Sequence, residues 1–105
     1  MSKINNYRNY REVFTEDLKN NPEKIRIYLE VSLEEYEKDH DSAALLLALK
    51  TVIKAQEGGI SALAKKTNLT REGLSKALSG KRNPKLETIT SVLHALGYRI
   101  SLTPL

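Results

Sequence analysis

The sequence predicts an all-α fold of five to six helices that ends in one short β-strand. Apolar residues recur at helical spacing along most of the chain, and Pro and Gly divide it into segments of helix length. Only residues 98–102 alternate apolar and polar with period two. The chain has 105 residues and no cysteine. It therefore fits a single domain over residues 1–105 with a modest core, and disulfides, thiolate metal sites and a cysteine nucleophile are excluded.

The first predicted helix, residues 11–19, carries Phe14 and Leu18 four residues apart on one face. Asn21 then suits the cap of a second helix, and Pro22 suits its first position, where the missing N–H costs nothing. These two residues predict where one helix ends and the next begins.

The second predicted helix, residues 22–38, has a main apolar stripe and a smaller apolar strip formed by Ile27 and Val31. We expect the first helix to cover this strip. A third helix, residues 42–56, is apolar on nearly every side, which is typical of the centre of a bundle. The glycine pair 58–59 ends it.

The C-terminal half predicts three further helices, over residues 60–66, 71–79 and 84–96. Asn83 suits the cap of the last helix and Gly97 its end. The strand that follows is not stable alone, so we expect it to pair with the N-terminal segment or with a second copy of the chain.

The helices over residues 60–66 and 71–79 fit a helix-turn-helix, with an ordinary helix pair as the alternative. Helices of about two turns joined by so short a connection need a steep crossing over a small shared apolar interface. Asn68 suits the positive φ of the turn, Leu69 is expected in the core, and Thr70 can cap the second helix. The side chains expected to face inward are Leu63, Ala64, Leu74, Ala77 and Leu78.

The outward face of the second of these helices is polar, which suits a helix that reads base edges in the major groove. Arg71 and Lys76 are the best candidates for base contacts, with phosphate contact or solvation as the alternative. Glu72 reads bases or phosphates, or only stabilises the helix N-terminus. Gly73 is unfavourable in a helix, and close approach to DNA or to another helix are two open explanations. The predicted DNA-binding residues are Thr70, Arg71, Glu72, Ser75, Lys76, Lys81 and Arg82, the last two as phosphate contacts.

The charge of the chain is unevenly distributed. Residues 58–105 carry eight basic and two acidic side chains, a net charge of +6, whereas residues 22–41 carry three basic and seven acidic, a net charge of −4. The basic half suggests a polyanionic partner, and the acidic helix suggests a different surface. An ordinary solvated face is the alternative for each charge run.

Enzyme and membrane classes find little support in the sequence. His40 and His94 are far apart and lack a spaced set of carboxylates, and no glycine-rich phosphate loop or nucleophile elbow is present. The longest apolar run, residues 43–49, is too short for a membrane span, and the first residues lack the apolar centre of a signal peptide. We therefore expect a soluble cytoplasmic protein, not an enzyme, with no catalytic residues, metal site or cofactor.

A resemblance to a known family rests on the run EGGISALAKKTNLTREGLSKALSGKRNPKLETITSVLHALGYRISLTP. This run resembles the Xre/Cro-type, HigA-like antidotes of chromosomal toxin–antitoxin modules, the addiction-module antidote family. The preceding PEKIRIYLEVSLEEYEKDHDSAALLLALKTVIKAQ is similar to the lead-in of the same family, so the resemblance covers about residues 11–105. Its most specific points are residues 58–59, 70–74, 83–84 and 95–97. The family often has an aromatic residue where this chain has Ser75.

The resemblance implies a lambda-repressor-like helix-turn-helix bundle that binds operator DNA upstream of its own operon as a homodimer. It also implies a small basic toxin partner of the RelE/HigB-like, mRNA-cleaving class, which the protein neutralises without catalysis of its own. On this reading, the acidic helix complements the toxin. Two alternatives stay open, a free-standing Xre/Cro-type repressor without a toxin and an adaptor that uses the motif to bind protein. The predicted toxin-binding residues are Glu30, Glu34, Glu35 and Glu37.

Overall fold

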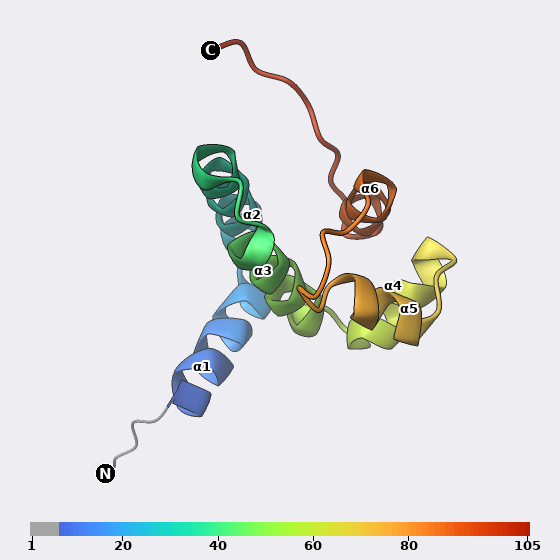
Figure 1. Cartoon of the computed structure of the whole chain (residues 1–105). Helices are drawn as coiled ribbons and strands as arrows, with labels where there is room; N and C mark the ends of the chain where they lie inside the picture. Colours follow the sequence, from blue (N-terminus) through green and yellow to red (C-terminus); the bar gives the residue numbers. More distant parts are fainter. Residues whose placement is uncertain (1–6) are drawn as a thin grey trace. The chain divides into compact units, whose positions relative to one another are not determined.

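The computed structural model describes residues 7–105, and the chain divides into two compact units, Met1–Glu57 and Gly58–Leu105. All regular secondary structure in the described residues is helical, which confirms the all-α class (Figure 1). The first unit holds α1 (Tyr7–Asn20), α2 (Pro22–Asp39) and α3 (Ser42–Ala55), and the second holds α4 (Gly59–Thr67), α5 (Arg71–Ala77) and α6 (Leu86–Ala95).

The predicted C-terminal strand is wrong. At the end of α6, Gly97 takes a φ of +100°. Its N–H donates to the His94 carbonyl at 3.0 Å, and the Tyr98 N–H donates to the Leu93 carbonyl at 2.8 Å, which together close the helix. Residues 98–102 then continue with neither helix nor strand (Figure 1). Alternating side chains do not make a strand without a partner for its backbone groups, and no segment within residues 7–105 supplies one.

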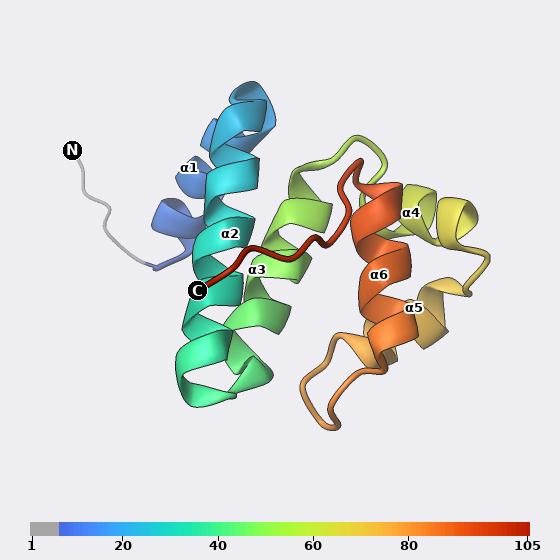
Figure 2. The same ribbon diagram turned by 90° about the horizontal axis from the view of Figure 1, so that it is seen from above.

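In the first unit, α3 contacts both α1 and α2, and Figure 2 shows α2 and α3 side by side. Seven α3 side chains are buried, which agrees with the central place predicted for this helix. Burial of these side chains is the main source of stability in the unit, at about 1.5–3 kcal/mol for each large aliphatic side chain. The buried apolar residues of α1 and α2 are Leu18, Ile25 and Leu29, and those of α3 are Leu45, Leu46, Ala48, Leu49, Val52, Ile53 and Ala55.

Polar side chains fix the two helix junctions of this unit. Asn21 occupies the N-cap of α2 as predicted, but its side chain donates back to the Asp17 carbonyl at 2.9 Å and to the Asp17 carboxylate at 2.8 Å. Lys24 forms an ion pair with the same carboxylate at 2.8 Å. At the next junction, the Asp41 carboxylate accepts a hydrogen bond from the Ala43 N–H at 2.9 Å and caps α3.

The expectation that α1 covers the Ile27–Val31 strip is wrong. Leu18 is fully buried, but Phe14 packs edge-on against Tyr28, with ring centroids 5.1 Å apart. The aromatic contact therefore brings α1 to the side of α2 that carries Tyr28. As a result Ile27 stays 47% exposed and Val31 48% exposed.

In the second unit, α4 contacts both α5 and α6. Leu69 does not fill the core as expected, because it stays 37% exposed beside the turn. Ala77 is half-buried. The remaining inward-facing predictions are confirmed, and the buried side chains of this unit are Leu63, Ala64, Leu74, Leu78, Ile89, Val92 and Leu93.

The last helix begins two residues later than predicted, at Leu86, and its N-cap is Lys85 instead of Asn83. Lys85 has the extended backbone of a cap residue, with φ −70° and ψ 149°. Its carbonyl accepts from the N–H groups of Thr88 at 3.0 Å and Ile89 at 3.1 Å, so the first helical turn is built on this residue.

Replacement of Gly58 should be costly for two reasons, its backbone conformation and a close contact. Its φ is +81°, and a Cβ at this position would lie 2.6 Å from the Ala62 Cβ, well inside van der Waals contact. The left-handed backbone alone costs a non-glycine residue about 1–2 kcal/mol. We expect Gly58→Ala to lower the free energy of unfolding, measured by urea denaturation, by more than this amount.

Gly59→Ala is the matched control. Gly59 also has a positive φ, +55°, but a Cβ added there would meet no atom within 4 Å, so this change adds strain without a clash. Equal losses of stability in the two variants would show that the Ala62 contact is unimportant.

Candidate nucleic-acid interface

The connection from α4 to α5 is only three residues long, and its first residue sets the turn. Asn68 has the left-handed conformation predicted for it, with φ +63°. The Thr67 hydroxyl donates to the Ala64 carbonyl at 3.0 Å and accepts from the Leu69 N–H at 3.3 Å. These bonds satisfy backbone groups at the end of α4 and hold the turn.

Thr70 caps α5, as predicted. Its backbone is extended, with φ −76° and ψ 156°, and its hydroxyl accepts a hydrogen bond from the Gly73 N–H at 2.9 Å. A Cβ at Gly73 would lie 2.9 Å from this same hydroxyl oxygen, and no other atom outside the helix backbone and the two neighbouring residues lies within 4 Å of that position. The structure therefore supplies an explanation for the glycine that sequence reasoning missed, which is that it leaves room for the capping side chain.

The exposed face of α5 gathers most of the predicted DNA-binding residues. Leu74 and Leu78 are buried on one side of the helix. The polar side chains at the other positions of the helix reach solvent, so they are available to a partner. The residues that the structure brings together here, all exposed, are Thr70, Arg71, Glu72, Ser75 and Lys76.

Lys81 and Arg82 follow in the loop after α5, and both are exposed. Ser79 attaches this loop to the helix end. Its hydroxyl donates to the Lys76 carbonyl at 2.8 Å and accepts from the Lys81 N–H at 3.3 Å. Serine often bonds nearby backbone in this way, and that tendency was the available sequence signal for its positioning role.

The basic side chains of the second unit are not neutralised by neighbours. The ion pairs formed between described side chains all lie in the first unit, in α1 and α2. The positive charge of residues 58–105 is therefore available to a polyanion. The exposed cationic side chains around α5 are Lys65, Lys66, Arg71, Lys76, Lys81, Arg82 and Lys85.

The predicted toxin-binding glutamates lie in the other unit. Glu30 forms an ion pair with Arg26 at 2.7 Å, and Glu35 forms one with Lys38 at 3.6 Å. Arg26 also pairs with Glu23, and by this hydrogen bond and its charge it lowers the pKa of the Glu23 carboxyl. The remaining two glutamates form no ion pair with any residue of the described chain. All four, Glu30, Glu34, Glu35 and Glu37, are exposed on α2.

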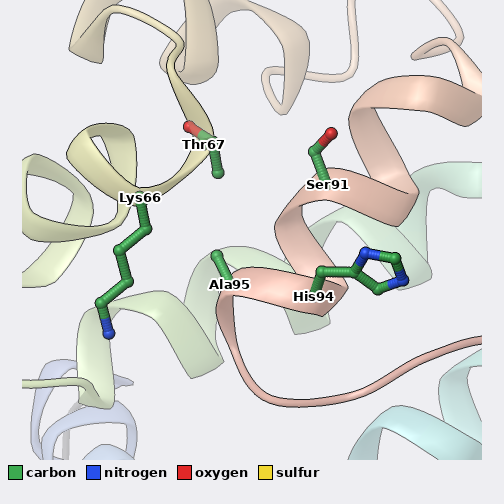
Figure 3. A pocket seen from close by; sticks show the side chains of 5 residues that line it. All are labelled: Lys66, Thr67, Ser91, His94 and Ala95. Carbon is green, nitrogen blue, oxygen red and sulfur yellow. The ribbon is translucent and has the colours of Figure 1, made fainter.

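A hollow between α4 and α6 does not have the character of a small-molecule site. Figure 3 shows Lys66 and His94 pointing to opposite sides of it, so their polar ends do not converge on one ligand position. The Thr67 hydroxyl is already engaged by backbone.

Over residues 7–105, no three side chains of the His, Cys, Asp and Glu types are placed to hold a metal ion. In the same part of the chain, every helix is too short or too polar to cross a membrane.

The cap of α5 can be tested by a double-mutant cycle. We expect Thr70→Ala to lower the free energy of unfolding by about 1 kcal/mol. With Thr70 present, we expect Gly73→Ala to gain little, because its Cβ meets the capping hydroxyl. In the Thr70→Ala background the same change gains the full helix preference of Ala, about 1 kcal/mol. Thr70→Ser, which keeps the hydroxyl, is the control, and additive effects in the cycle would contradict the explanation given for Gly73.

Comparison with known proteins places the chain in a family. Residues 11–104 match the family described as "Probable addiction module antidote protein". An uncharacterized protein of Haemophilus influenzae (strain ATCC 51907 / DSM 11121 / KW20 / Rd) is 36% identical over 81 residues, which is 76% of each chain. No solved structure matches the chain. The family match covers nearly the whole sequence, α2 and the α4–α5 segment included, and the chain therefore belongs to the family of probable addiction module antidote proteins.

Proposed function

We propose that this protein is the antitoxin of a type II toxin–antitoxin module, of the Xre/Cro-type, HigA-like class. In this proposal it binds and neutralises a RelE/HigB-like, mRNA-cleaving toxin, and it binds operator DNA to autoregulate its operon. It acts by binding alone, without a catalytic step. Family membership supports the antidote role, and the geometry of the second unit supports the DNA-binding role.

The observation that carries the DNA-binding proposal is the exposed, unpaired positive charge around α5. Arg71 and Lys76 project from a short helix whose start is fixed by the Thr70 cap. Lys81 and Arg82 lie just beyond its end. Fixed helix ends matter, because base readout requires side chains at defined positions relative to the groove.

The proposed roles follow from the chemistry of each side chain. Arg71 and Lys76 donate to the acceptor edge of guanine, and Lys81 and Arg82 contact phosphates on either side of the groove. The Thr70 hydroxyl accepts from Gly73 and keeps its own hydrogen, so it can donate to a phosphate while it caps the helix. A symmetric dimer would place its two α5 helices about 34–36 Å apart, on half-sites separated by one turn of DNA.

Affinity capture from native cells tests the antitoxin role. The tagged chain is purified from the organism that encodes it, and co-purified proteins are identified by mass spectrometry. We expect a small basic protein in stoichiometric amount, encoded by a neighbouring gene. If no such partner comes with the folded, soluble chain, a free-standing repressor becomes the better explanation.

Base contacts and phosphate contacts should affect DNA binding in two different, measurable ways. We expect Arg71→Ala combined with Lys76→Ala to abolish preference for the operator over random DNA, while the chain still folds. Lys81→Ala combined with Arg82→Ala should weaken binding to all sequences, and it should reduce the slope of log K against log[salt] by about 2. Both are measured by fluorescence anisotropy titrations at several salt concentrations.

Lys50→Ala combined with Lys54→Ala provides a control of the same charge change. Both side chains are exposed on α3, in the first unit. We expect neither operator preference nor salt slope to change in this variant. Unchanged operator preference in the Arg71/Lys76 variant would remove α5 from its proposed role.

A further inference from the structure

The first unit exposes apolar side chains on α2 and on α1, and an aromatic contact links the two helices. Ile27 and Val31 are neighbours four residues apart on α2, and each is nearly half exposed. Tyr28, three residues before Val31, packs against Phe14 of α1 at 5.1 Å. Phe14 is 39% exposed, and Tyr10, one helical turn before it, is 71% exposed. We call these five residues the apolar edge.

Carboxylates border the α2 part of this edge. Residues three or four apart are neighbours on a helix surface, so Glu23, Lys24 and Glu30 lie beside Ile27, and Lys24 is already paired with Asp17. Glu34 and Glu35 lie beside Val31 by the same spacing. Over its whole length α2 carries six acidic and three basic side chains, a net charge of −3. The apolar edge is thus set in a negative surface that the ion pairs of α2 neutralise only in part.

The apolar centre and acidic rim favour one kind of binding partner over others. Nucleic acid is disfavoured, because its phosphates would meet carboxylates. In a twofold dimer of this chain the same patch faces itself, so one net negative surface would face another. A basic protein is favoured on both counts, because it brings opposite charge to the rim and apolar side chains to the centre.

We propose that the apolar edge, centred on Ile27 and Val31, is where the basic toxin docks, an inference that rests on the proposed antitoxin function. The apolar pair anchors the complex, so it governs the dissociation rate. The carboxylates of Glu34 and Glu37, which have no ion-pair partner within the described chain, steer the encounter and govern the association rate. These residues belong to the first unit, and the proposed DNA contacts belong to the second.

The test uses the full-length chain and the purified product of the small basic gene adjacent to its own. Ile27→Gln combined with Val31→Gln keeps good helix formers at exposed positions, so the fold is preserved. By surface plasmon resonance, we expect this variant to bind the toxin at least about a hundredfold more weakly, through faster dissociation. Glu34→Gln combined with Glu37→Gln should slow association several-fold and reduce its salt dependence, with little change in dissociation.

Leu47→Gln is the matched control, because Leu47 is an apolar side chain of the same unit, 44% exposed, that lies outside the edge. We expect it to bind toxin like the wild type, and all variants to keep wild-type circular dichroism and operator affinity. Wild-type toxin affinity in the Ile27/Val31 variant would overturn the docking proposal while leaving the antitoxin function intact. Conversion of a dimer to a monomer in that variant, with toxin affinity unchanged, would identify the edge as a self-interface. Failure of the wild-type chain to bind the toxin would overturn both proposals.

Discussion

The orientation of α5 depends on the three residues that connect it to α4. Asn68 reverses the chain in a left-handed conformation, and Thr70 begins the next helix by accepting the Gly73 N–H. An isolated helix of seven residues would not persist in water, so α5 exists because this cap and the burial of Leu74 hold it in place. The polar face of α5 is therefore a consequence of the turn, because the turn decides which side chains point inward.

The two units differ in whether their charged side chains form ion pairs, and this difference matters more for binding than for stability. The ion pairs of α1 and α2 are exposed, and pairs of this kind contribute only about 0–1 kcal/mol each. Their larger effect is electrostatic: each pair places opposite charges side by side, which weakens the electrostatic field around the first unit. The second unit has no such pairs in the described chain, so its excess of six positive charges acts on the surroundings undiminished.

Sequence reasoning succeeded where local chemistry decides the structure. Pro22 at the start of α2, Asn68 in the turn and Gly97 at the end of α6 each act through backbone preferences that are fixed within a few residues. The exposure of the predicted site residues on α5 followed from the helical spacing of its apolar residues. The ion pairs of Arg26, which sequence reasoning did not predict, follow the same local spacing, because Arg26 stands three residues after one glutamate and four before another.

Sequence reasoning failed where a distant partner decides. Residues 98–102 have the alternation of a strand, but strand formation depends on a neighbour that the pattern does not specify. Ile27 and Val31 have the spacing of a buried strip, but the contact between Phe14 and Tyr28 directs α1 elsewhere. The exposed strip thus became the central feature of the proposed docking surface because tertiary packing overrode a local pattern.

The chemical contrast between the two proposed interfaces gives them unequal responses to salt. The two phosphate contacts proposed for Lys81 and Arg82 imply a slope of about −1.8 in log K against log[salt] for each protomer, so DNA affinity falls by roughly tenfold per protomer between 50 and 200 mM. An apolar centre loses little over that range, since salt screens only its charged rim. Because apolar burial dominates one interface and counterion release the other, rising salt should release the antitoxin from DNA long before it releases the toxin.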